Sequence, residues 1–100
     1  MPAFLVELHR SGTSWQDRLP AEEQSGWEVH AAFMDALVDS GFVLLGGPVA
    51  GEHRVVLAVE AASEDDVHVV LAQDPWSGSH LQLVSLEPWR LRLDSRNRAF

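Results

Sequence analysis

The sequence predicts an α+β domain with the element order β-α-β-β-α-β. Three observations predict it. The chain of 100 residues begins with a short segment in which apolar and other residues alternate, as in a strand. A long helical repeat of apolar residues follows, and after it comes a pair of apolar strand segments separated by a glycine-rich stretch. A shorter helical pattern and one last strand pattern complete the chain.

The first half of the chain predicts one strand and one long helix. Residues 3–8 alternate, so that Phe4, Val6 and Leu8 share one face of a strand. A polar loop over residues 10–18 follows. We expect the helix to open at Leu19-Pro20, because proline suits a first helical turn, and to stop at Gly41. Its apolar stripe recurs at helical spacing and comprises Trp27, His30, Ala31, Met34, Leu37, Val38 and Gly41.

The second half predicts a hairpin, a helix and a final strand. Residues 42–45 read as a buried strand that leaves through a tight turn at Gly46-Gly47-Pro48, and residues 53–60 return antiparallel to it. Ser63 is the expected N-cap of a helix with Val67, Val70 and Leu71 on its apolar stripe, and Asp74-Pro75 ends that segment. The last strand is expected over residues 81–93, bent at Pro88. Together these elements predict a ferredoxin-like fold: a four-stranded antiparallel sheet with both helices on one face.

Composition limits the partners of this chain. Its formal charge is −8, all seven basic residues are arginine and cysteine is absent. Such an acidic chain repels phosphate backbones and anionic membranes, so neither nucleic acid nor a membrane is expected as a partner. Disulfides and thiolate ligands are excluded, and no apolar run is long enough to span a membrane. We therefore expect one cytoplasmic domain over residues 1–93 and a charged tail over residues 94–100.

Apolar residues on both faces of the predicted strands indicate a partner subunit. If the helices cover only one face of the sheet, the other face would expose an apolar patch, and such patches usually mark an interface. We expect two sheets to pack face to face in a symmetric homodimer. The residues behind this expectation are Phe4, Leu5, Val6, Leu44, Leu45, Val55, Val56, Leu57, Leu83 and Val84.

Five short motifs, in order, resemble the YCII-related (YciI-like) family over residues 1–93. They are Phe4-Leu5-Val6, His30 in the first helix, Leu45-Gly46-Gly47-Pro48, Asp74-Pro75-Trp76 and Val84-Ser85-Leu86-Glu87-Pro88-Trp89. The resemblance implies a dimeric α+β barrel. It also implies a site built on His30 and Asp74, and acid–base work on a small ring compound, since one relative type removes chloride from a chlorinated hydroxyquinol. The chain departs from shorter members in the insertion over residues 10–19 and in its tail.

The residues themselves support a candidate site at His30. A titratable ring on an apolar helix stripe suits a general acid or base, although it could equally be a hydrogen-bonded core histidine. A carboxylate at Asp74 would fix its tautomer, while the competing interpretation is a helix-ending turn. Trp27 and Trp76 could wall a substrate pocket or simply pack in the core. Gly47, with Pro48 beside it, could admit a ligand to the backbone or merely form a turn.

Two functions remain open from the sequence. The first is an acid–base enzyme, of the isomerase, lyase or dehalogenase-like type, acting on a small cyclic metabolite through His30 and Asp74. The second is a non-catalytic dimeric module that binds a ligand or partner in the same pocket. A haem-binding or cofactor-free monooxygenase ranks lower. We expect no cofactor, because no flavin or nicotinamide fingerprint is present, and no metal, because the histidines lack metal-ligand spacing.

Overall fold

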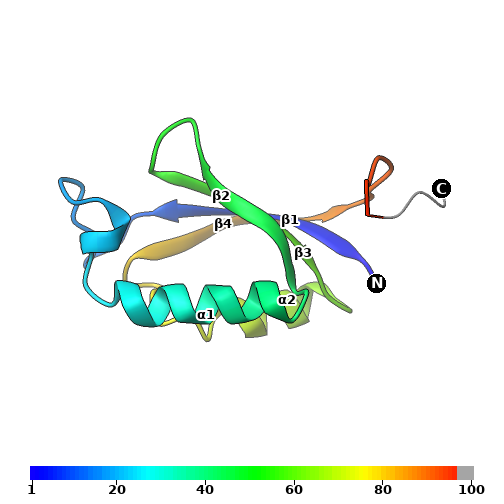
Figure 1. Cartoon of the computed structure of the whole chain (residues 1–100), viewed down its shortest axis with the longest axis horizontal. Coiled ribbons are helices and arrows are strands. Elements are labelled where there is room, and N and C mark those ends of the chain that lie inside the picture. Colours follow the sequence, from blue (N-terminus) through cyan, green and yellow to red (C-terminus); the bar gives the residue numbers. More distant parts are fainter. Residues whose placement is uncertain (97–100) are drawn as a thin grey trace.

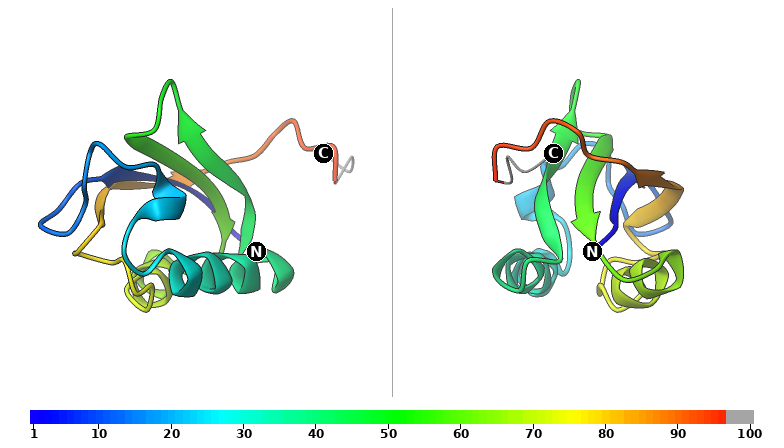
Figure 2. Two further views of the ribbon diagram at one scale, coloured as in Figure 1. Left: turned by 60° about the vertical axis from the view of Figure 1, so that its left-hand side comes forward. Right: turned by 90° about the vertical axis from the view of Figure 1, so that its right-hand side faces the viewer.

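The strands form a single antiparallel sheet, and both helices lie on one of its faces (Figures 1 and 2). The computed structural model describes residues 1–96. The sheet order is β2-β3-β1-β4, which is the ferredoxin-like order, so the predicted α+β fold is confirmed. The elements are β1 (Ala3–Arg10), a 3₁₀ turn η1 (Ala21–Glu23), α1 (Trp27–Asp39), β2 (Val43–Val49), β3 (Arg54–Glu60), α2 (Glu64–Leu71) and β4 (Leu81–Trp89).

The core lies between the sheet and the helices. β1 is central, and its buried residues Phe4, Val6 and Leu8 pair with Val59, Leu57 and Val55 of β3. Alternate residues of a strand point to the same face, so these side chains lie together. They pack in one cluster with Val67 and Leu71 of α2, on the face that the helices cover. Val67 of α2 is fully buried against this layer. β1 runs two residues beyond the predicted segment, to Arg10, and this extension brings Arg10 opposite Leu81 of β4.

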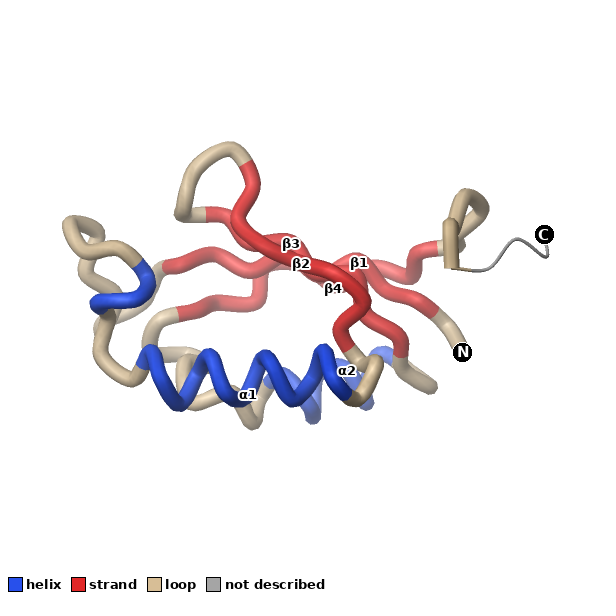
Figure 3. The backbone as a smooth tube through the Cα atoms, in the orientation of Figure 1, coloured by secondary structure: helices blue, strands red, loops and turns tan. Residues whose placement is uncertain are grey.

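The predicted turn at Gly46-Gly47-Pro48 is wrong. These three residues continue β2 and pair with Leu57, Val56 and Val55, and the chain reverses after Val49 (Figure 3). Ala50 and Gly51 supply the reversal with φ angles of 53° and 120°.

Close packing explains the glycine at 46, and the edge of the sheet explains the proline at 48. A Cβ atom on Gly46 would lie 3.0 Å from the carbonyl oxygen of Val56 and would overlap the Leu57 side chain. Pro48 has no N–H to donate, which an edge strand such as β2 tolerates.

The first helix begins later than predicted, at Trp27 rather than at Leu19. The side-chain amide of Gln24 donates to the carbonyl oxygens of Gln16 and Leu19, at 2.7 and 2.9 Å, and Gly26 adopts a left-handed φ of 74°. These contacts hold the intervening segment as a loop with a single 3₁₀ turn, η1. Within α1 only His30 is buried. Val38, which the periodicity placed on the apolar stripe, is exposed.

The second helix begins where the sequence predicted. The Ser63 hydroxyl accepts a hydrogen bond from the backbone N–H of Asp66 at 3.2 Å, so Ser63 is the N-cap of α2. Val67 and Leu71 are buried as expected.

The last strand is shorter than the predicted range 81–93, because β4 ends at Trp89. Trp89 pairs with Ala3, the first residue of β1, so the chain beyond it has no neighbouring strand. Of the predicted tail, residues 94–96 are described, with Arg96 paired to Asp94, and residues 97–100 lie outside the described residues. In the described part of the chain, no helix is long and apolar enough to cross a membrane.

Candidate functional site

His30 and Asp74 are joined by a buried hydrogen bond. His30 lies in the first turn of α1, and Asp74 follows the end of α2, 44 residues later in the chain. The His30 Nδ1 atom lies 2.9 Å from both carboxylate oxygens of Asp74. Both side chains are nearly inaccessible to solvent, at 11% and 6% exposure. A carboxylate cannot donate, so Nδ1 carries the proton of this bond and Nε2 of the neutral ring bears the lone pair.

The Asp74 carboxylate is fixed by a second donor. Its Oδ1 atom accepts the backbone N–H of Trp76 at 2.9 Å, in the local pattern typical of aspartate before a turn. The predicted turn role of Asp74 and its contact with His30 are therefore both present. The turn holds the carboxylate, and the carboxylate orients the imidazole ring.

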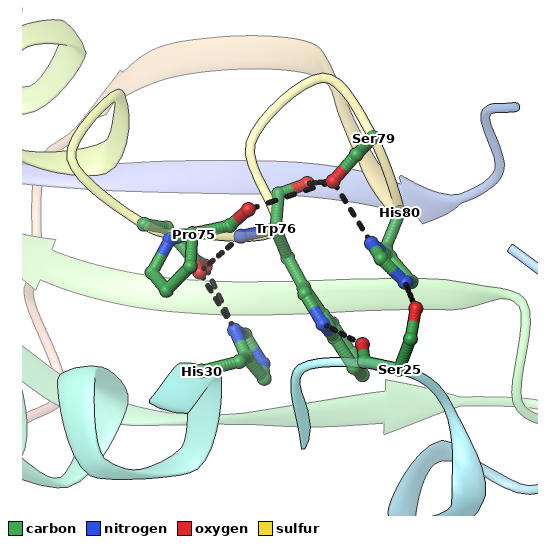
Figure 4. Close-up of polar contacts among 7 residues, drawn as sticks. Ser25, His30, Pro75, Trp76, Ser79 and His80 are labelled. Carbon is green, nitrogen blue, oxygen red and sulfur yellow. Dashed lines mark hydrogen bonds and ion pairs between the residues drawn. The ribbon is translucent and has the colours of Figure 1, made fainter. Parts of the chain in front are cut away.

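Trp76 is stacked between two histidines (Figure 4). The His30 ring lies parallel to the indole, with centroids 4.0 Å apart and an interplanar angle of 6°. On the other indole face lies the His80 ring, at 4.8 Å and 12°. The indole Nε1–H donates to the carbonyl oxygen of Ser25 at 2.8 Å, and only 1% of Trp76 is exposed. Trp76 thus limits the movement of the His30 ring.

His80 is held by two hydroxyl groups that the sequence analysis did not single out. Ser25 Oγ lies 2.9 Å from Nε2, and Ser79 Oγ lies 2.8 Å from Nδ1. The pKa of His80 is lowered, mainly because burial disfavours the charged ring; His30 lowers it further, and Asp74 opposes the shift. No motif around His80 signals this contact, because Ser25 is 55 residues away in sequence.

The lowered pKa of His80 predicts a loss of stability on acidification. In the unfolded chain the ring takes up its proton near pH 6.5, whereas the folded protein resists protonation until a lower pH. Between these two pKa values the unfolded state binds more protons, so the free energy of unfolding falls as pH falls from about 7 through this window. Urea unfolding at pH 7.5, 6.5 and 5.5 measures it.

The matched variants for this measurement are His80→Gln and His53→Gln. The first should flatten the pH dependence, because the buried titrating ring is gone. The second removes an exposed histidine and should leave the pH dependence as it is in the wild type. An equally steep dependence in His80→Gln would show that His80 is not its source.

A cavity of about 230 Å³ lies between the sheet and the helices, beside the His30–Asp74 pair. Most of its lining is apolar and comes from the covered face of the sheet and from both helices: Leu8, Met34, Val55, Leu57, Leu71, Ala72, Leu81 and Leu83. The polar lining residues are Arg10, His30, His68, Asp74 and Ser77. An apolar pocket with a few convergent polar groups is the usual form of a small-molecule site.

The structure brings some of the predicted site residues to this cavity and leaves others elsewhere. His30 and Asp74 line it, whereas Trp27, Trp76, Gly47 and Pro48 do not. Trp76 is buried behind the His30 ring, and Trp27 packs beside it with ring centroids 5.8 Å apart. Gly47 and Pro48 belong to the edge strand β2. The predicted contact of Gly47 and Pro48 with a substrate stays a prediction. Trp27 and Trp76 pack against each other and against His30.

Arg10 and His68 line the cavity although the sequence analysis did not select them. Strand alternation offered a signal for Arg10, since it continues the face of Phe4, Val6 and Leu8. The signal was missed because the predicted strand ended at residue 8. His68 is one helical turn before Ala72, another lining residue, but nothing in the sequence showed that this side of α2 borders a cavity.

Comparisons with protein-family models, with curated proteins and with solved structures found no match for this chain. The resemblance to YCII-related proteins therefore stays a prediction. Within residues 1–96, no three histidine, aspartate or glutamate side chains gather where they could hold a metal ion.

Proposed function

We propose that this protein is an acid–base enzyme that moves a proton on a small cyclic metabolite, with His30 as the proton carrier. The observation that carries the proposal is the polarised imidazole at an apolar cavity. Asp74 accepts the Nδ1 proton of His30, which leaves the Nε2 lone pair as the base and stabilises the charged ring once Nε2 has taken a proton.

The free end of His30 supports this role. Nε2 makes no hydrogen bond within the described residues. Every fully buried side-chain nitrogen there has a hydrogen-bond partner, so Nε2 must be partly accessible to solvent. His30 also lines the cavity. The indole face against the ring also favours a cationic imidazolium. Together these contacts stabilise the state that the base reaches after removing a proton.

The cavity suggests a substrate with one ring. An apolar cavity of about 150 Å³ in another protein holds benzene, so 230 Å³ suits a single ring with small substituents. Drug-sized ligands need roughly 300 Å³ or more. The apolar lining suits the body of such a ring, and the His30–Asp74 pair borders the cavity on one side.

Hydrogen–deuterium exchange tests the proposal without knowledge of the natural substrate. Single-ring ketones, lactones and phenols are incubated with the protein in D₂O, and loss of carbon-bound protons is followed by NMR. We expect the wild type to accelerate exchange beside the carbonyl or hydroxyl group of at least one compound. His30→Gln should reduce this rate by about 10²–10⁴-fold, the usual contribution of a general acid–base group.

Two further variants give this experiment its controls. Asp74→Asn should slow exchange, because the amide no longer stabilises a charged ring, and His53→Gln should not. Undiminished exchange in His30→Gln would contradict the role of His30. If a compound binds the wild type and is released without exchange, the non-catalytic binding module becomes the better description.

We further propose that the protein forms a homodimer through the open face of its sheet, as a dimeric α+β barrel does. The strand register places Leu45, Ala58 and Leu5 in one row across this face, and Leu45 is 69% exposed. The open face is less apolar than the sequence suggested. The adjoining rows hold Glu7 and Arg54, joined by a salt bridge at 3.2 Å. In the proposed dimer, these charged residues form ion pairs across the two-fold axis that relates the protomers.

Light scattering combined with size-exclusion chromatography tests the dimer. We expect the wild type at micromolar concentration to show twice the mass of one chain. Leu45→Glu should give a monomer, because it buries a charge at the proposed interface. Val69→Glu is the control, since Val69 is similarly exposed but lies on α2, on the helix side. A monomeric wild type would contradict the proposal.

A further inference from the structure

The cavity contains one arginine that the proposed proton transfer does not use. Arg10 is the last residue of β1 and pairs with Leu81, so its side chain shares the covered face of the sheet with Leu8. It lines the same cavity as His30 and Asp74. Its side chain is only 11% exposed. Charged side chains are rarely buried unless they are paired, so the partners of this guanidinium matter.

The structure fixes Arg10 through one of its nitrogen atoms. Nη1 donates to the backbone carbonyl of Glu52 at 2.9 Å and to the Glu52 carboxylate. The guanidinium carbon also lies 5.6 Å from the centre of the Trp15 ring. The loop before β3 and the loop after β1 thus hold the guanidinium in place. A receptor group that is already positioned loses less entropy on binding.

The rest of the guanidinium is free to bind a ligand. In the described part of the chain, neither Nε nor Nη2 of Arg10 makes a hydrogen bond. Every fully buried side-chain nitrogen there has a hydrogen-bond partner. Both atoms therefore keep accessible surface. Nε–H and one Nη2–H point the same way along one edge of the guanidinium, the edge that matches the two oxygens of a carboxylate.

Among the described residues that line the cavity, no acidic group is free to pair with Arg10. The Glu52 side chain is 73% exposed, so solvent screens its pairing with Arg10. The one acidic residue of the lining, Asp74, already accepts from His30 and from the backbone of Trp76. The remaining surface is mainly apolar. A ligand that satisfies this cavity has an apolar body and one planar anionic group.

We propose that the cavity binds a small aromatic or alicyclic monocarboxylate, with its carboxylate on Nε and Nη2 of Arg10 and its ring on the apolar lining beside His30. This inference rests on the proposed function for the site and names its substrate class. A phosphate dianion fits less well, because the edge formed by Nε–H and Nη2–H matches the two coplanar oxygens of a carboxylate and most of the lining is apolar. Binding of the carboxylate does not depend on proton transfer by His30.

Calorimetric titration with benzoate, benzamide and inorganic phosphate tests the inference. Benzamide has the shape of benzoate but no charge. We expect benzoate to bind the wild type at least about 10-fold more tightly than benzamide, as a charge-assisted bidentate pair requires, and phosphate to bind more weakly than benzoate. Arg10→Gln should abolish the preference for benzoate and leave benzamide binding unchanged. Arg10→Lys should keep only part of the preference, because a lysine makes no bidentate pair.

Glu52→Gln makes the test independent of how well the Arg10 variants fold. It keeps the backbone carbonyl that positions Nη1 and removes the competing charge, so benzoate should bind several-fold more tightly. Equal affinities for benzoate and benzamide in both the wild type and Glu52→Gln would overturn the inference. His30→Gln separates it from the proposed function: we expect this variant to bind benzoate while it no longer exchanges protons. In the wild type, a preference for benzoate without any proton exchange would contradict the proposed function alone, and exchange without that preference would contradict this inference alone.

Discussion

Trp76→Ala should destabilise the protein by about 3–5 kcal/mol, the usual cost of truncating a large buried aromatic side chain. Trp76 is the largest side chain that is fully buried, at 1% exposure. The substitution removes the surface on which His30 and His80 stack and the donor to the Ser25 carbonyl. In a domain of this size such a loss is a large fraction of the total stability. Urea unfolding at pH 7.5 measures it.

Trp76→Phe is the matched variant. It keeps an aromatic face between the two histidines but lacks the indole N–H, so it should lose less stability than the alanine variant. A loss below about 1 kcal/mol in Trp76→Ala would contradict the central role of this ring in the core. If the alanine variant is folded at low temperature, hydrogen exchange should show faster opening at the Ser25 loop, because Trp76 and His80 both anchor that loop.

Asp74→Ala should cost on the order of 3 kcal/mol, because it leaves two donors without an acceptor. His30 Nδ1 and the backbone N–H of Trp76 both donate to this carboxylate in the protein interior. An unpartnered buried donor costs roughly 1–3 kcal/mol. Asp74→Asn keeps one side-chain oxygen for the Trp76 N–H and should lose less. Chemical denaturation of both variants measures the difference.

The nitrogen-15 chemical shifts of the His30 ring distinguish orientation from packing. In the wild type at alkaline pH, the neutral ring should carry its proton on Nδ1, because the carboxylate can only accept. In Asp74→Asn the amide can donate to Nδ1, so the tautomer with the proton on Nε2 should gain population. An unchanged tautomer in Asp74→Asn would mean that Asp74 does not set the state of His30, and the acid–base proposal would lose its basis.

Local periodicity predicted most of the fold. The alternation around Val6, the helical spacing around His30 and the N-cap at Ser63 depend on neighbours a few residues away, and all three elements form. Two of the local predictions were wrong, because contacts that the local pattern does not contain decided the structure there. Gly46-Gly47-Pro48 reads as a turn, but pairing with β3 extends it. The segment before Trp27 reads as a helix, but Gln24 bonds to the preceding loop instead.

In the candidate site too, some features followed from the sequence and others only from the tertiary structure. The sequence by itself indicated that His30 was unusual, because a titratable ring stood on an apolar stripe. The resemblance to YCII-related proteins implied Asp74 as its partner, but no distance between them. Only the tertiary structure decided that their atoms lie 2.9 Å apart, that Trp76 stacks against the ring rather than lining the cavity, and that Arg10 reaches it. Secondary structure follows from interactions between near neighbours in the chain, whereas a cavity is formed by residues from separate elements, whose distances are set when those elements pack.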